Sequence, residues 1–246
     1  MPQPNRPEAD PNDMTLVGHL AELRSRLIKS LLALIAGCAA TWSFAEDIVG
    51  FILRPVIEIL PPGQTLIYTG LQDAFIITFK TGLWAGLFLT TPFWMYQIWA
   101  FVAPALKPRE KQKAPLLAGL ATILMLAGAA FAYFLAFPLA FKFFLTFSTD
   151  LMHPLLAVDR YLSLALGLIL AFALAFQLPL ALMFLGRLGL IEAAFLRRHR
   201  RYAVLIAFIL GALLTPPDVV SQCLLAFSLL LLYELSIILM PKPADQ

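Results

Sequence analysis

The sequence sets two glutamates among basic residues, where a carboxylate could recognise a cationic partner. Glu22 lies within HLAELRSRL, residues 19–27, and Glu110 is the one acid among the four bases of residues 107–113. A carboxylate binds a guanidinium group through paired hydrogen bonds, and an ammonium group does not reproduce that geometry. The residues alone also allow a simpler interpretation, in which Glu22 pairs with Arg26 one helical turn later and Glu110 balances local charge.

Motifs of enzymes, metal sites and nucleotide sites do not occur in the sequence. There is no His-Glu-x-x-His, no Gly-x-Ser-x-Gly and no Gly-Lys pair of a phosphate-binding loop. The two cysteines, Cys38 and Cys223, both lie inside apolar runs, which argues against a disulfide framework and a zinc site. We therefore predict a protein that is not an enzyme and that has no cofactor, no metal and no nucleic-acid partner.

The elements that must position the glutamates are apolar segments of membrane-spanning length. Of the 246 residues, 61% are hydrophobic and 13% are charged, against about half and a quarter in ordinary soluble domains. Six apolar runs occupy residues 27–44, 75–101, 114–137, 161–186, 202–214 and 219–240. The first four approach the roughly 20 residues that a helix needs to cross about 30 Å of hydrocarbon. We predict an all-α membrane protein with six transmembrane helices.

The last two runs are short, and two interpretations of them stay open. Only 16 uncharged residues separate Arg201 from Asp218, and 15 separate Asp218 from Glu234, so each helix reaches about 24 Å or less. The pair forms either a re-entrant hairpin or two spans in a locally thinned bilayer. We favour two spans joined by the compact turn TPPD at residues 215–218.

Lys and Arg residues indicate how the six helices are oriented. One set of loops, together with both chain ends, holds 13 bases, whereas the opposite loops hold two, Arg54 and Arg160. Because loops rich in Lys and Arg stay in the cytoplasm, we predict that both termini are cytoplasmic. Lys29 and Lys80 lie in or beside apolar runs, and we expect both to reach the lipid headgroups. The 13 bases are Arg6, Arg24, Arg26, Lys107, Arg109, Lys111, Lys113, Arg187, Arg197, Arg198, Arg200, Arg201 and Lys242.

The predicted organisation is a disordered polar N-terminus at residues 1–13, a six-helix transmembrane domain at 14–240 and a cytoplasmic tail at 241–246. Within the domain, residues 14–27 have the pattern of an amphipathic helix lying at the membrane interface. Its leucines recur on one face, and its polar side chains, Glu22 among them, share the other.

Three prolines interrupt the apolar runs. Pro92, Pro138 and Pro179 each lack a backbone donor, so each should kink the helix that contains it. Two interpretations stay open: neighbouring helices accommodate the kinks without further consequence, or the kinked helices pack around a concave wall, which is the arrangement we predict.

Four sequence blocks resemble the TatC family, the signal-peptide-receptor subunit of the twin-arginine protein translocase. The first is HLAELRSRL at residues 19–27, and the second is QIWAFVAPAL at 97–106, followed by Glu110. The third combines AYF at 132–134 with FPLAF at 137–141, and the fourth is LLTPPD at 213–218, followed by Ser221-Gln222. The blocks occur in order on a chain that already has the derived topology, and this makes the resemblance specific.

The resemblance implies a receptor in the bacterial inner membrane that binds twin-arginine signal peptides of folded cargo proteins at its cytoplasmic face. Its implied partners are single-span subunits of the TatA and TatB types, further copies of itself and the lipid bilayer. Transport would be driven by the proton-motive force. The implied peptide-binding residues are Glu22, Glu110, His19, Arg24 and Phe101. Structural or partner contacts are implied for Pro55, Tyr133, Gln177 and Asp218.

Gln177 departs from the family pattern, which often has Glu at this position. Gln does not titrate, so the resemblance supports a role in helix docking here and puts a proton-linked role in doubt. A transporter of small solutes is a further alternative, but the sequence has no internal repeat and no matching pair of broken helices.

Overall fold

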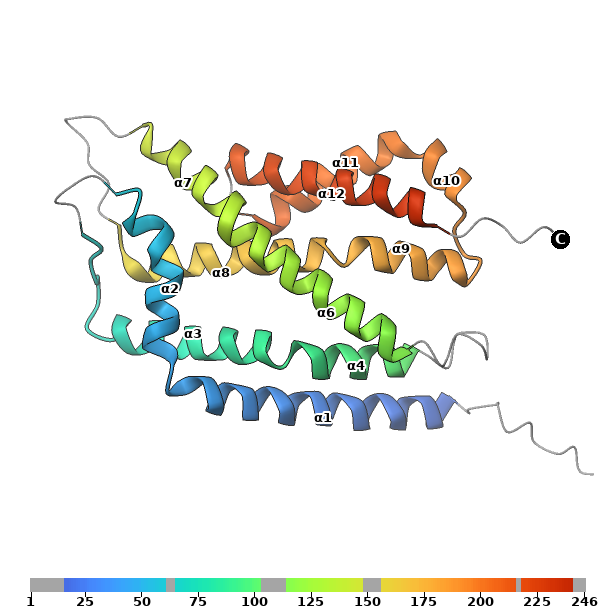
Figure 1. Ribbon diagram of the computed structural model, residues 1–246, viewed down its shortest axis with the longest axis horizontal. Coiled ribbons are helices and arrows are strands. Elements are labelled where there is room, and N and C mark those ends of the chain that lie inside the picture. The colour runs from blue at the N-terminus through green and yellow to red at the C-terminus, as the bar shows by residue number, and fades with distance from the viewer. Residues whose placement is uncertain (1–15, 61–64, 103–113, 148–155, 216–217, 241–246) are drawn as a thin grey trace, which may run out of the picture.

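The computed structural model describes residues 16–60, 65–102, 114–147, 156–215 and 218–240, and these ranges are almost entirely helical (Figure 1). The first four helices are α1 (Leu16–Trp42), α2 (Ala45–Ile57), α3 (Asp73–Leu89) and α4 (Thr91–Val102). They are followed by α6 (Ala114–Phe131), the π-helix η2 (Ala132–Ala136), α7 (Phe137–Leu145), α8 (Val158–Ala175), α9 (Leu178–Arg187), α10 (Ala193–Arg198), α11 (Arg200–Leu214) and α12 (Val219–Leu239). The predicted all-α fold is confirmed.

The long helices run lengthwise through the molecule, and α2 lies across them at one end (Figure 1). Three stretches are long and apolar enough to cross a membrane alone, namely Ala114–Leu145, Val158–Arg187 and Val219–Leu239. Two bent pairs add one crossing each, α1–α2 with a bend of 82° and α3–α4 with a bend of 54°. The sixth crossing is α11, whose 15 residues reach about 22 Å.

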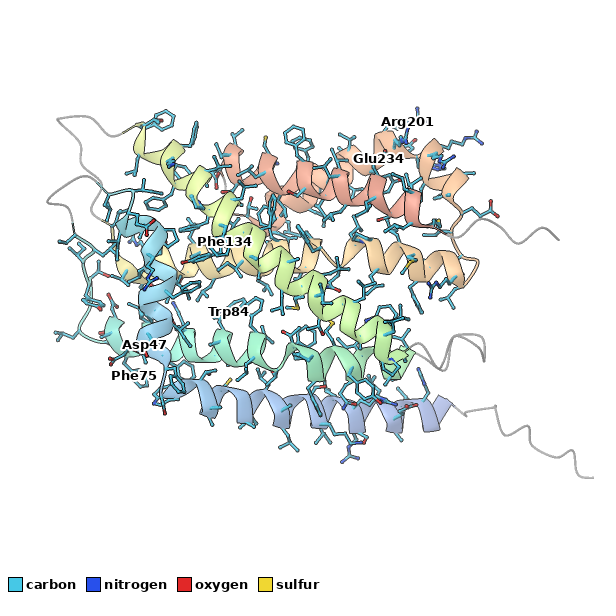
Figure 2. The ribbon with its side chains drawn as sticks, in the orientation of Figure 1. Asp47, Phe75, Trp84, Phe134, Arg201 and Glu234 are labelled. Carbon is cyan, nitrogen blue, oxygen red and sulfur yellow. The ribbon has the colours of Figure 1, made fainter. Side chains whose placement is uncertain are left out.

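Charged side chains mark the two ends of the helical bundle. Asp47 lies at the end where α2 crosses, and Arg201 and Glu234 lie at the other end (Figure 2). Between the ends, large apolar side chains such as Ile123 and Ile209 are 65% and 56% exposed. Exposure of an apolar band of this extent to water would be unfavourable, whereas contact with the hydrocarbon of a bilayer is favourable. The start of α1 and the end of α12 lie at the same end of the bundle, as an even number of crossings requires (Figure 1).

Each of the three prolines predicted to bend a helix lies at a break. Pro92 follows the bend between α3 and α4, Pro138 follows η2 at the start of α7, and Pro179 follows the break between α8 and α9. A proline ring clashes with the carbonyl four residues earlier, which for Pro138 is that of Phe134, inside the π-helical turn. An apolar groove of about 330 Å³ lies between the bent helices, lined by residues of α2, α3, α6, η2 and α8.

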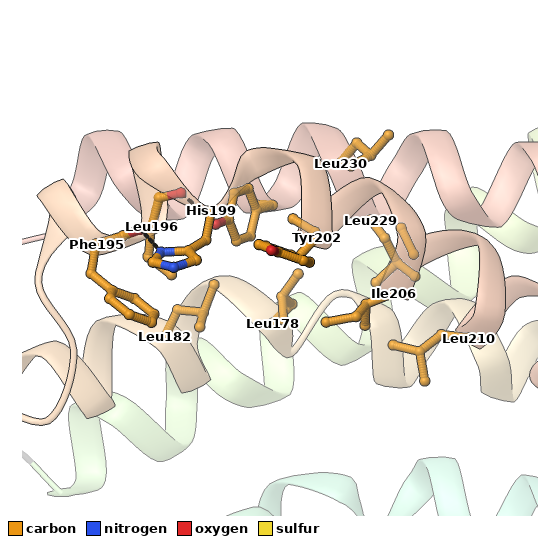
Figure 3. A pocket seen from close by; sticks show the side chains of 13 residues that line it. Leu178, Leu182, Phe195, Leu196, His199, Tyr202, Ile206, Leu210, Leu229 and Leu230 are labelled. Carbon is orange, nitrogen blue, oxygen red and sulfur yellow. Dashed lines mark hydrogen bonds between the residues drawn. The ribbon is translucent and has the colours of Figure 1, made fainter.

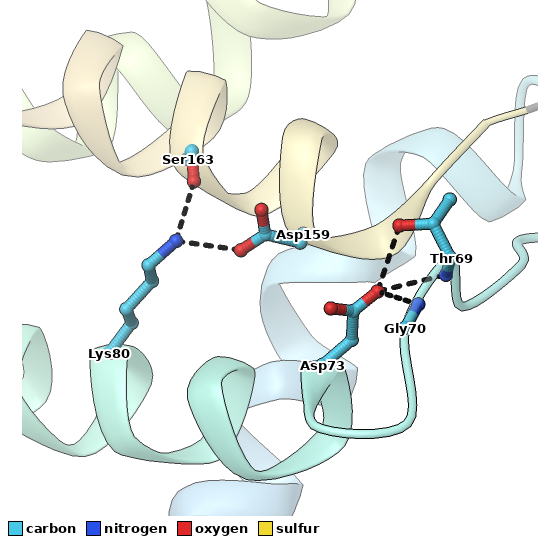
Figure 4. A network of polar contacts seen from close by, with 6 residues as sticks. All are labelled: Thr69, Gly70, Asp73, Lys80, Asp159 and Ser163. Atoms are coloured by element: carbon cyan, nitrogen blue, oxygen red, sulfur yellow. Dashed lines mark hydrogen bonds and ion pairs between the residues drawn. The ribbon is translucent and has the colours of Figure 1, made fainter.

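Lys80, which we expect to reach the headgroups, also has polar partners on a neighbouring helix. Its Nζ donates to Oδ1 of Asp159 at 2.6 Å and to Oγ of Ser163 at 3.2 Å (Figure 4). The first turn of α8 packs beside α3 and places Asp159 within reach, so the partly exposed ammonium group has two partners on α8. This pair ties α3 to α8 at the end of the bundle where α2 crosses.

Removing both members of the Lys80–Asp159 pair should therefore destabilise the protein by less than the two single removals added together. Lys80→Met leaves a carboxylate without its cation, and Asp159→Asn leaves a cation without its anion, so each single change should lower the free energy of unfolding by about 1–2 kcal/mol. The double variant should cost less than the sum of the two, with a coupling of about 0.5–1 kcal/mol because the pair is partly exposed. Thermal unfolding in detergent measures this, and additive single effects would contradict the account.

Candidate functional site

The glutamate of the first sequence block lies on α1, which runs without a break from residue 16 to residue 42. The predicted interfacial helix is thus the first part of a spanning helix, and this corrects the expectation of a separate element. Its leucine face is the exposed one, with Leu20 at 63% and Leu27 at 65%. The polar face turns inward because α4 presents polar and aromatic side chains to it.

Glu22 and Arg26 form the ion pair that their spacing predicts. Nε and Nη2 of Arg26 both donate to Oε1 of Glu22, at 2.9 and 2.6 Å. Nη1 of the same guanidinium donates to Oε1 of Gln97 at 3.3 Å, and Gln97 is buried on α4. Arg26 therefore bridges α1 and α4 and fixes the position of the Glu22 carboxylate.

The second carboxylate oxygen of Glu22 is the notable feature of the site. Oε2 is buried, and among the residues that the structure describes it has no hydrogen-bond partner. A buried acceptor without a donor costs about 1–3 kcal/mol, and most such atoms in native proteins do find a partner. The arrangement thus supplies a negatively charged acceptor that is held in place and lacks a donor among the described residues.

His19 and Phe101, two of the residues assigned to peptide binding, are brought together from distant parts of the sequence. Their rings stack with centroids 4.4 Å apart and an interplanar angle of 22°. His19 lies one turn before Glu22 on α1, and Phe101 lies one turn after Gln97 on α4, so an aromatic pair borders the carboxylate. Arg24 is exposed on α1.

Glu110, the other predicted acid, lies outside the residues that the structure describes, and so do the remaining bases of residues 107–113. The peptide-binding residues that can be placed are therefore those on α1 and α4.

Two of the residues expected to make structural contacts fix α2, the helix that lies across the bundle. The Tyr133 hydroxyl donates to the carbonyl of Phe51 at 2.6 Å, and the two rings stack with centroids 4.5 Å apart. Pro55 lies inside α2 and lines the same cavity as Tyr133. Both residues are thus far from Glu22, at the opposite end of the bundle.

Gln177 and Asp218 have separate structural roles within the chain. Nε2 of Gln177 donates to the carbonyl of Ala121 at 3.0 Å, so its amide docks the break between α8 and α9 against α6. Oδ1 of Asp218 accepts from the backbone N–H of Ser221 at 2.6 Å, which makes Asp218 the N-cap of α12.

An apolar groove of about 390 Å³ lies between α9, α10, α11 and α12 (Figure 3). Leu182, Phe195, Tyr202 and Leu229 line it, and Phe195 and Tyr202 are about half exposed. The exposed aromatic rims of this groove mark a face on which a further apolar helix could pack.

Gln97 and Asp159 are the polar residues that the sequence reasoning did not single out. Gln97 stands in the second sequence block, and a polar side chain in an apolar run is the signal that could have indicated its role. No local pattern links it to Arg26, which lies 71 residues away.

The fold defines a multi-pass, all-helical membrane protein, with a partly buried carboxylate held between its first two spans. The sequence model of the family described as Sec-independent protein translocase protein (TatC) matches residues 18–227. The chain belongs to this family. It is therefore a component of a protein translocase, a transport protein and not an enzyme.

Individual relatives match nearly the whole chain. TatC of Desulforapulum autotrophicum is 41% identical over 89% of this chain and 82% of its own. TatC of Aquifex aeolicus is 40% identical over 92% and 94%, and that of Escherichia coli K12 is 37% identical over 90% and 86%.

Two crystal structures of the twin-arginine translocase receptor TatC share the fold. One has a TM-score of 0.79 at 39% identity and covers 89% of this chain and 96% of its own. The other, in DDM, has a TM-score of 0.82 at 38% identity and covers 91% and 99%. These similarities confirm the predicted family and the six-span fold.

Proposed function

We propose that this chain is the receptor of the twin-arginine translocase, and that Glu22 binds an arginine of the signal peptide. The observation that supports the proposal is the carboxylate whose Oε1 is held by Arg26 and whose Oε2 is buried without a partner. Two crystal structures of the same fold, at 38–39% identity, are described as the twin-arginine translocase receptor TatC.

In this proposal, a peptide guanidinium donates to Oε2 of Glu22 while Arg26 keeps Oε1. Arg26 and Gln97 are positioning residues because they fix the carboxylate and leave one acceptor oxygen for the ligand. The stacked pair of His19 and Phe101 borders the site, and an aromatic face attracts a guanidinium plane by cation–π interaction. Glu110 and Arg24 remain assigned to peptide binding by the family resemblance, with Glu110 as the acceptor for the second arginine.

The preference for arginine over lysine tests the proposal on the unmodified chain. A guanidinium offers several N–H groups in one plane, whereas an ammonium is a compact and strongly hydrated charge. A signal peptide with paired arginines should bind the purified protein in detergent at least about tenfold more tightly than its double-lysine variant. Equal dissociation constants for the two peptides would contradict a site that is specific for guanidinium groups.

We propose that the end of the bundle that carries Glu22 faces the cytoplasm of a bacterium, with the chain in the inner membrane. The support is the Lys/Arg asymmetry of the loops. In a variant with Cys38 and Cys223 replaced by Ser, an impermeant thiol reagent added to intact cells should label Arg160→Cys. It should not label Glu110→Cys or Arg198→Cys. Labelling at position 110 would contradict the proposed orientation.

We further propose that the chain works with single-span subunits of the TatA and TatB types, and that it self-associates in a larger complex that exports folded proteins with the proton-motive force. The short α11 and the apolar groove beside it support a partner helix at this face. A photocrosslinker at Phe195 or at Leu213, both exposed, should capture such a subunit in membranes. Capture of lipid alone at both positions would count against the proposal.

A further inference from the structure

A second polar site occupies the end of the bundle opposite Glu22. A cavity of about 380 Å³ opens between α2 and the η2–α7 segment, and it is lined by the charged side chains of Arg54, Glu58 and Lys142. In the described part of the chain, the ion pairs are Glu22–Arg26, Lys80–Asp159 and Arg200–Glu234. The three charges of the cavity therefore have no ion-pair partner there, although Arg54 and Glu58 are one helical turn apart.

The three charges approach the cavity from two walls. Arg54 lies in the last turn of α2 and Glu58 caps that helix, whereas Lys142 lies in the last turn of α7. Two cations and one carboxylate around one cavity match a ligand that carries both an anionic and a cationic group. Complementary placement of charges favours such a ligand over one that carries a single charge.

The polar cavity adjoins an apolar one. The groove of about 330 Å³ between α2, α3, α6 and α8 shares Phe51, Tyr133 and Phe134 with it and continues past Trp84 and Leu126. Trp84 on α3 and Phe134 on η2 are both labelled in Figure 2, nearer the middle of the bundle than Asp47. The shared aromatic ridge is fixed, since the Tyr133 hydroxyl is bonded to the Phe51 carbonyl.

A polar cavity beside an apolar groove, both on the flank of a membrane protein, fits a lipid. We propose that the site binds a phospholipid with a phosphoethanolamine headgroup. The phosphate lies between Arg54 and Lys142, the primary ammonium donates to Glu58, and one acyl chain follows the apolar groove. Choline cannot donate an N–H to the carboxylate, and a glycerol headgroup has no cation for it. This proposal is independent of the peptide site, which lies at the other end of the bundle.

Native mass spectrometry of the delipidated protein tests the proposal. The probes are three lipids with the same palmitoyl and oleoyl chains and ethanolamine, choline or glycerol headgroups, and free O-phosphoethanolamine as the headgroup without chains. The bound fraction should be at least about threefold higher for the ethanolamine lipid than for the other two, and the free headgroup should not bind. Glu58→Gln should abolish this preference, and Arg54→Gln with Lys142→Gln should reduce the retention of the ethanolamine lipid at least about fivefold.

Arg160→Gln is the matched control, because Arg160 is an exposed cation that lines neither cavity. It should leave lipid retention and headgroup preference unchanged. Thermal unfolding of each variant without lipid checks that these exposed substitutions leave the fold intact. Equal retention of the three lipids by the parent, a preference that survives Glu58→Gln, or equal binding of the free headgroup would overturn the proposal.

Discussion

Glu22→Gln should weaken the binding of a twin-arginine signal peptide by at least about tenfold, while the protein stays folded and inserted. A charge-assisted hydrogen bond is worth about 1.5–3 kcal/mol, and about 1.4 kcal/mol corresponds to a factor of ten in the dissociation constant. Gln keeps the shape of the side chain and loses its charge, so the effect isolates electrostatic recognition. Glu22→Ala should be similar, and Glu22→Lys should be worst because it adds repulsion.

Glu234→Gln is the matched control for this change. Glu234 also accepts from an arginine, Arg200, at 2.7 Å. It lies at the end of the bundle where α1, the helix of Glu22, begins (Figures 1 and 2). The two variants lose the same charge from an arginine ion pair, although that of Glu234 is more exposed, so a general electrostatic effect would weaken peptide binding in both. Fluorescence anisotropy with a labelled peptide gives the dissociation constants. Parent affinity for Glu22→Gln would show that the recognition site has been placed wrongly.

Gly128→Leu should prevent the bundle from packing. Gly128 is buried on α6 where this helix crosses α8, and a Cβ atom there would lie 2.5 Å from the carbonyl oxygen of Phe172 and 2.9 Å from Cα of Ala173. Both atoms belong to the backbone of α8, so no side-chain rotation relieves the clash. Overpacking typically costs about 1–3 kcal/mol, and we expect a loss at or above the upper end of this range.

Gly119→Leu provides the comparison within the same helix. A Cβ at Gly119 meets no atom within 4 Å, and Leu has a helix propensity better than that of Gly by up to about 1 kcal/mol. Thermal unfolding in detergent should thus show a strongly lowered or absent transition for Gly128→Leu and an unchanged or raised one for Gly119→Leu. Similar melting temperatures for the two variants would refute the close packing of α6 on α8.

The features that the sequence predicts well are those that depend on local patterns. Apolar runs locate the spans, prolines such as Pro138 locate the breaks, and a spacing of four residues predicts the pair of Glu22 and Arg26. Every helix that spans a bilayer must present apolar side chains to the lipid, so the apolar band can be predicted from the composition along the chain.

Features that depend on which helices become neighbours could not be predicted in the same way. Lys80 has a local pattern typical of a lysine that reaches the headgroups, and only the packing of α3 on α8 shows that Asp159 meets it. The sequence did not predict the helix α2. This helix mixes apolar and charged residues and lies across the spans after a bend of 82°, so its sequence does not have the pattern of a span. The leucines of the first helix are exposed because lipid, and not a protein core, covers them.

The coupling between Glu22 and the arginines of the signal peptide tests the central claim most directly. Four dissociation constants, for the parent and Glu22→Gln with the double-arginine and double-lysine peptides, complete a double-mutant cycle. If the carboxylate reads the guanidinium groups, the change from arginine to lysine should weaken binding at least about fivefold more in the parent than in Glu22→Gln, a coupling of about 1 kcal/mol. An equal arginine-to-lysine penalty in both proteins would contradict the account.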